Sequence, residues 1–102
     1  MTHIQELRDV IHHLHGAKAE HVESVPVTES FDGQTVWDGI VEVFDLEGHP
    51  KTHRVYAWMH DTGDPAKPKR HVIVLHIPPV VSPQTAVKAA IVQEFKDRAK
   101  AN

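Results

Sequence analysis

The spacing of apolar residues predicts one helix at each end of the chain. Between residues 3 and 15, apolar side chains recur every three or four positions, which is typical of one buried helical face. Gly16 can end this helix in a left-handed conformation. Near the other end, Ser82 is a typical N-cap and Pro83 suits the first helical position. The apolar stripe of this second helix consists of Val87, Ile91, Phe95 and Ala99.

The segment between the helices predicts four β-strands, at residues 22–31, 35–46, 52–60 and 70–77. Asp32-Gly33 favours a two-residue hairpin turn in which both central residues have positive φ. Such a turn would place Gly39 opposite Pro26. Because a proline cannot donate a ladder hydrogen bond, the first strand should lie at a sheet edge. Short connections favour an antiparallel meander with the order α-β-β-β-β-α.

The fragment RVYAWMH, residues 54–60, divides into two alternating sets of side chains. Symmetric hairpins would place Val41 opposite Tyr56, and Trp58 opposite Val72. Opposed residues share a face of the sheet. Val55, Ala57 and Met59 therefore fall on an aliphatic face, together with Ile40, Phe44, Ile73, Leu75 and Ile77.

We predict that both helices pack on the aliphatic face, because both must bury an apolar stripe. The predicted fold is thus α+β: a four-stranded antiparallel meander with the N- and C-terminal helices on one face. Its length suits a single domain spanning residues 1–102. The opposite face would then be open and rich in rings. The candidate binding residues on it are Trp37, Arg54, Tyr56, Trp58, His60 and His76.

An open face of this kind predicts a protein that acts by association. We expect a homodimer that forms through the helix-free sheet face, because Trp, Tyr and Arg are enriched at interface hot spots. One alternative is a small-molecule binding protein or enzyme with its site on the same face, oriented by Arg54, His60 and His76. A second alternative is binding of single-stranded nucleic acid through stacked bases.

Composition limits the chemistry further. The chain has no cysteine, which excludes disulfides and thiolate chemistry. His12 and His15 could share an ion on one helix face, but two ligands do not form a zinc site. The sequence thus predicts no metal, no cofactor and no catalytic residues, and enzymatic activity is not the favoured function.

Charge is unevenly distributed along the chain, whose net charge is −3. The first fifty residues carry two basic and ten acidic side chains, and the remainder carries nine basic and four acidic ones. The two halves can neutralise each other in the fold or support association. Ten histidines predict a large rise in charge, and pH-dependent assembly, in mild acid.

The start of the chain lacks the basic and apolar regions of a secretory signal. No apolar run approaches the roughly 20 residues that a membrane span needs. We therefore expect a soluble cytoplasmic protein without a membrane partner.

Overall fold

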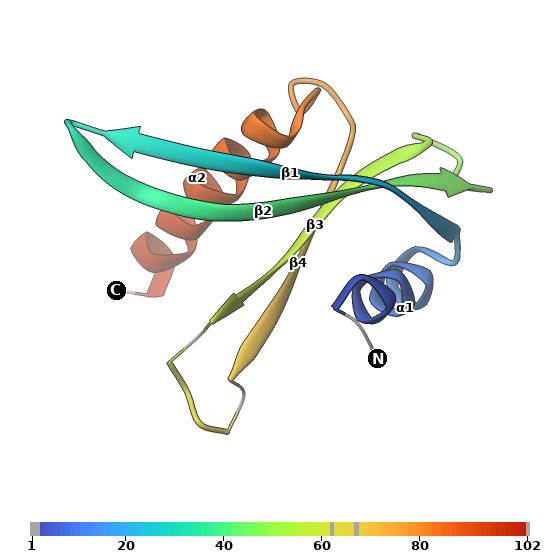
Figure 1. The fold of residues 1–102 in the computed structure, drawn as a ribbon. Coiled ribbons are helices and arrows are strands. Elements are labelled where there is room, and N and C mark those ends of the chain that lie inside the picture. The colour runs from blue at the N-terminus through green and yellow to red at the C-terminus, as the bar shows by residue number, and fades with distance from the viewer. Residues whose placement is uncertain (1–2, 62, 67, 102) are drawn as a thin grey trace.

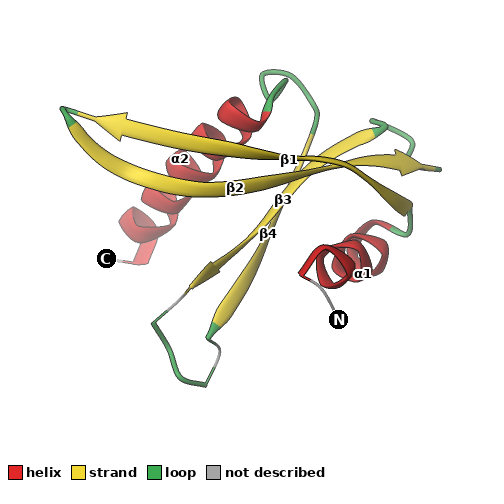
Figure 2. Ribbon diagram, viewed as in Figure 1, coloured by secondary structure: helices red, strands yellow, loops and turns green. Residues whose placement is uncertain are grey.

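The computed structural model describes residues 3–61, 63–66 and 68–101, apart from the side chains of residues 61, 95 and 97–101. The predicted α+β class and the antiparallel meander are confirmed, with strand order β1-β2-β3-β4 (Figures 1 and 2). No helix among these residues is long and apolar enough to cross a membrane. The elements are α1 (His3–His15), β1 (Lys18–Phe31), β2 (Gln34–Glu47), β3 (Arg54–Asp61), β4 (Lys69–Leu75) and α2 (Pro83–Ala101).

Local signals in the sequence set three of the element boundaries. Asp32 and Gly33 have φ angles of 56° and 79°, as the predicted hairpin turn requires. Gly16 ends α1 with a φ of 64°, and its N–H bonds to the carbonyl oxygen of His12 at 2.8 Å. Ser82 caps α2, because its Oγ accepts a hydrogen bond from the N–H of Thr85 at 3.2 Å.

The strand registers agree with the prediction in part. Trp58 lies opposite Val72, as predicted. Between β2 and β3, however, Val43 rather than Val41 lies opposite Tyr56. Because side chains alternate with a period of two, this two-residue difference leaves every side chain on its predicted face.

The pairing of the first hairpin differs from the prediction because β2 contains a bulge. The register shifts between Glu29 and Ser30, so Gly39 lies opposite Val27 and not opposite Pro26. The two-residue turn itself is correct. The extra residue enters β2 next to the turn, and hairpin chemistry alone gives no signal of it.

The two helices pack on opposite faces of the sheet, which corrects the prediction that both lie on one face. Val55 and Ala57 belong to a cluster with Leu7 and Ile11 of α1. Their neighbours Tyr56 and Trp58 belong to a second cluster with α2. Figure 1 shows α2 behind the β1–β2 hairpin and α1 near the start of β1, well apart from α2. The α1 cluster contains Leu7, Ile11, Ala17, Ala19, Phe44, Leu46, Val55 and Ala57. The α2 cluster contains Val27, Val41, Val43, Tyr56, Trp58, Val80, Ala86 and Val87.

The helices lie on opposite faces of the sheet because both faces of β3 carry large apolar side chains. With α2 over the ring-rich face, Tyr56 is 2% exposed and Trp58 is 3% exposed. Burying a large apolar side chain stabilises a fold by roughly 1.5–3 kcal/mol, so an open ring-rich face would forgo this contribution several times. One helix on each face buries both sets.

Candidate functional site

The six predicted binding residues do not form one open surface. Tyr56 and Trp58 are buried beneath α2, so the predicted helix-free contact face is occupied by the chain itself. The hydroxyl of Tyr56 hydrogen-bonds to Nδ1 of His76 at 2.6 Å. Arg54 donates from Nε to Asp45 Oδ1 at 3.2 Å. Arg54 and His76 line a separate hollow of about 470 Å³ at the other end of β3.

Three of the six residues, Trp37, Trp58 and His60, line a larger hollow of about 640 Å³, which we call the α2 groove. It lies between α2 and the sheet, and it continues around the outer edge of β4. Its lining residues are Leu14, His15, Trp37, Trp58, His60, Arg70, His71, Val72, Ile73, Val74, Ala89, Ala90, Ile91, Gln93 and Glu94.

Two indole rings form the ring-rich end of the α2 groove. Trp37 and Trp58 meet edge to face with their centroids 5.6 Å apart. A Cβ atom at Gly39 would lie only 3.1 Å from the ring of Trp37, so the missing side chain lets this ring lie against the backbone of β2. The sequence placed both tryptophans on one face, and the tertiary structure brings them together.

The outer edge of β4 combines an unpaired backbone with apolar side chains on both faces. The N–H of His76 bonds to the carbonyl oxygen of Arg54 at 3.0 Å, which marks these residues as a hydrogen-bonded pair. Such pairs alternate along an antiparallel ladder, so the backbone groups of His71 and Ile73 point away from β3. The described residues contain no strand beyond β4. The side chains from Val72 to Leu75 are all half-buried.

The opposite edge of the sheet, at β1, is better protected. Pro26 interrupts its donor groups, and the register shift between His21 and Glu23 bends it. Glu20 and Glu23 add exposed charges. Natural edge strands carry such devices against unwanted pairing, and β4 has none between Val72 and Leu75.

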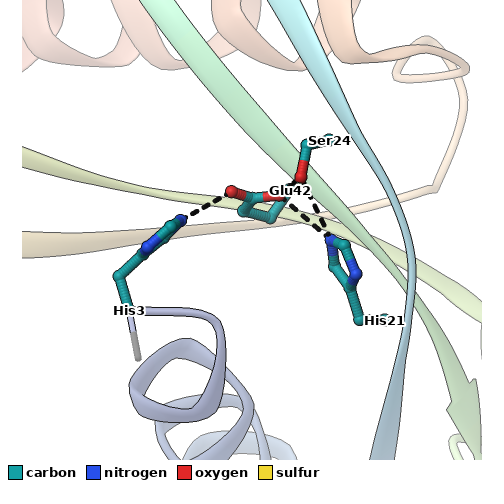
Figure 3. A network of polar contacts seen from close by, with 4 residues as sticks. All are labelled: His3, His21, Ser24 and Glu42. Atoms are coloured by element: carbon teal, nitrogen blue, oxygen red, sulfur yellow. Dashed lines mark hydrogen bonds and ion pairs between the residues drawn. The ribbon is translucent and has the colours of Figure 1, made fainter. Parts of the chain in front are cut away.

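A cluster of polar side chains, separate from the two hollows, surrounds the carboxylate of Glu42, which is 2% exposed (Figure 3). His3 of α1 contacts its Oε2 from Nε2 at 2.7 Å. His21 of β1 contacts Oε1 from Nε2 at 3.0 Å, and the hydroxyl of Ser24 donates to the same oxygen. The cluster therefore joins the start of α1 to β1 and β2.

The hydrogen bonds around Glu42 keep it charged. Burial disfavours the carboxylate and would raise the pKa, but the hydrogen bonds from Ser24, His3 and His21 outweigh burial and lower the pKa. In a catalytic triad the acid and the hydroxyl bind different ring nitrogens of the histidine. Here Ser24 and Glu42 both approach Nε2 of His21, so the arrangement does not activate a nucleophile.

Glu42 is not among the residues predicted from the sequence, although a signal for it is present there. Its position in β2 has the parity of Ile40 and Phe44, so it faces α1 as a single acid in an aliphatic row. Ile40, which we predicted on the aliphatic face, is 49% exposed, and Glu42 lies opposite Ala57.

The remaining histidines are dispersed. His15 meets His49 edge to face at 5.6 Å, and burial together with the charge of His49 lowers the pKa of His15. His12 instead lies 3.3 Å from the carbonyl oxygen of Ala17, measured from Nδ1. Within the described ranges, no group of three or more histidine, aspartate and glutamate side chains could hold a metal ion.

No protein-family model matches the chain, and neither curated proteins nor solved structures match it significantly. Its function must therefore be inferred from the β4 edge, the α2 groove and the Glu42 cluster.

Proposed function

We propose that this domain acts by self-association, and that two copies pair along their β4 edges. The observation that carries the proposal is the aliphatic run from Val72 to Leu75, which is only half-buried although it is apolar on both faces of an edge strand. Runs that are apolar on both faces are typical of strands in the middle of a sheet. This interface replaces the predicted contact through the ring-rich face, which α2 covers.

A two-fold axis through Ile73 gives the best-matched antiparallel register. The outward N–H and C=O of Ile73 would pair with the same groups of the second copy. On the α1 face, Ile73 would then meet Ile73 of the second copy. On the α2 face, Val72 would meet Val74 of the second copy. The pairing would join two four-stranded sheets into one.

The pattern of β4 favours a second copy over an unrelated strand. An isologous contact pairs a surface with itself, so a strand that is apolar on both faces meets a strand of the same kind. An amphipathic peptide would present polar side chains to one of the two faces. The α2 groove also reaches both faces of β4, which suits a strand that sends alternate side chains to each.

Proline substitution tests the proposal selectively. Ile73→Pro removes the outward N–H but leaves the bonds that Val72 and Val74 make to β3, so the fold should persist and the dimer should dissociate. Ile73→Ala is the matched control, since it loses the same packing and keeps the N–H. Sedimentation at micromolar protein should show a dimer for the wild type and for Ile73→Ala, and a monomer for Ile73→Pro. A monomeric wild type, or a dimeric Ile73→Pro variant, would contradict the proposal.

The absence of native cysteines allows a second test of the register. Hydrogen-bonded pairs in antiparallel sheets have Cα atoms about 5.5 Å apart, which is within the range of a disulfide. Oxidised Ile73→Cys should form a disulfide-linked dimer rapidly. Lys51→Cys, which lies in an exposed loop, should remain a monomer under denaturing electrophoresis. Equal cross-linking of both variants would argue against pairing at Ile73.

A further inference from the structure

We propose that the α2 groove binds a small apolar carboxylate, with its apolar body between α2 and the sheet and its carboxylate at Arg70. This inference goes beyond self-association, although Val72, Ile73 and Val74 both line the groove and lie at the proposed interface. Trp37, Trp58 and the alanines of α2 form the body of the site, whereas the pairing edge is the backbone of β4.

Burial of the α2 side chains falls along the helix, and the apolar part of the site lies where burial is incomplete. Ala86 and Val87 in its first turns are fully buried. Ala89 and Ala90, which follow, are only half-buried, and their small side chains leave space beside Trp58. The hollow of about 640 Å³ falls within the roughly 300–1,000 Å³ typical of small-molecule sites.

Charge selects the kind of ligand. Arg70 and His60 lie directly opposite each other on β4 and β3, and both are exposed at the groove. Arg70 forms no ion pair with any other described residue. A guanidinium group binds a carboxylate with two parallel hydrogen bonds, so a ligand carboxylate fits this position better than a neutral or cationic group.

Apart from His60, the other titratable side chains that line the groove interact with partners of their own, so Arg70 is the cation available to a ligand. Glu94 lines the α2 wall and takes part in an interaction of its own. His71 points to the α1 face, where its Nε2 lies 3.1 Å from Oε1 of Glu6. His15 also lies on that side and meets His49. Among the described groove residues, Arg70 is thus the cation at the β3–β4 end, with His60 directly opposite it.

Medium-chain compounds test the proposal directly. Both tryptophans of the chain line the groove, so their fluorescence should change when decanoate binds. Calorimetry should show one decanoate per chain, with decanol weaker and decyltrimethylammonium weakest. Arg70→Gln should weaken decanoate binding by about tenfold or more, because a charged hydrogen bond contributes about 1.5–3 kcal/mol and 1.4 kcal/mol is tenfold. It should leave decanol binding unchanged.

Three controls keep this experiment decisive. Arg54→Gln changes the cation of the other hollow and should bind decanoate like the wild type. Ala90→Phe should fill the groove and abolish binding of both decanoate and decanol, with its fold checked by circular dichroism. Decanoate affinity should not change with protein concentration across the monomer–dimer transition of the wild type, which separates this proposal from self-association. The proposal is wrong if wild-type protein ignores millimolar decanoate, if the ammonium compound binds as tightly, or if Arg70→Gln and Arg54→Gln behave alike.

Discussion

At the scale of single residues, the chain places a charged carboxylate in its interior and surrounds it with donors. Glu42 has three side-chain partners, which come from α1 and β1. A buried charge without partners would be strongly destabilising. The cluster therefore ties the N-terminal helix to the first hairpin through electrostatics as well as packing. This contact could not be predicted from spacing, because His3 and Glu42 are far apart in sequence.

Glu42→Gln should lower the free energy of unfolding at neutral pH by about 1–3 kcal/mol, because the partners lose a charged acceptor. The pKa of Glu42 in the fold lies below its ordinary value of 4.5. Its stabilising contribution is therefore present above that value and is lost as the pH falls through the folded pKa. Urea denaturation across this pH range should show that the free energy of unfolding falls less steeply toward acid for Glu42→Gln than for the wild type.

Glu47→Gln provides the control for that experiment, because Glu47 is an exposed acid at the end of the same strand. It should unfold like the wild type. Equal acid sensitivity of wild type and Glu42→Gln would show that the cluster contributes nothing to folding.

At the scale of elements, amphipathic patterns predicted every helix and strand but not which sheet face each helix covers. A helical stripe specifies that one side must be buried, and any apolar surface satisfies that requirement. Val87 of the predicted α2 stripe is fully buried and Ile91 is half-buried, whereas the side chains of Phe95 and Ala99 lie outside the described residues. The face that α2 covers is the apolar face that α1 leaves uncovered.

The docking of α2 predicts different effects for two valines of the same helix. Val87→Ala should destabilise the fold by about 1.5–3 kcal/mol, because Val87 is fully buried against the ring-rich face. Val92→Ala should change stability by less than about 0.5 kcal/mol, since Val92 is 52% exposed. The change in helix propensity is the same for both. Similar urea midpoints for the two variants would mean that α2 does not cover the sheet as described.

At the scale of the whole molecule, β3 belongs to both clusters. Val55 and Ala57 pack toward α1, and Tyr56 and Trp58 pack toward α2. A strand shared in this way should couple the two sides, because neither cluster can lose β3 without the other. We therefore expect the domain to unfold in one cooperative transition.

Leu7→Ala tests this coupling across the sheet. Leu7 is fully buried in the α1 cluster, so its truncation should destabilise the domain by about 2–5 kcal/mol. Both tryptophans lie on the α2 side. Their fluorescence should nevertheless report the full shift in the urea midpoint and coincide with circular dichroism. A tryptophan transition that stays at the wild-type midpoint would show that the two clusters unfold independently.

The predicted compartment, the absence of a secretory signal and nucleic-acid binding remain predictions, because they depend on properties outside the fold. Self-association also remains a proposal, but its surface has moved from the ring-rich face to the β4 edge. In the sequence this edge is the run VIVL, residues 72–75. It is apolar on both faces, which is unusual for a strand at a sheet edge.

By itself, the sequence determined the elements, the turns, the meander and the partition of strand residues between two faces. These follow from local chemistry: helical spacing, caps, turn residues and the two-residue period of a strand. Only the tertiary structure decided that α2 covers the rings, that Glu42 is buried among two histidines and a serine, and that β4 remains open. Those outcomes depend on competition between distant surfaces for burial, and that competition is resolved only when the whole chain packs.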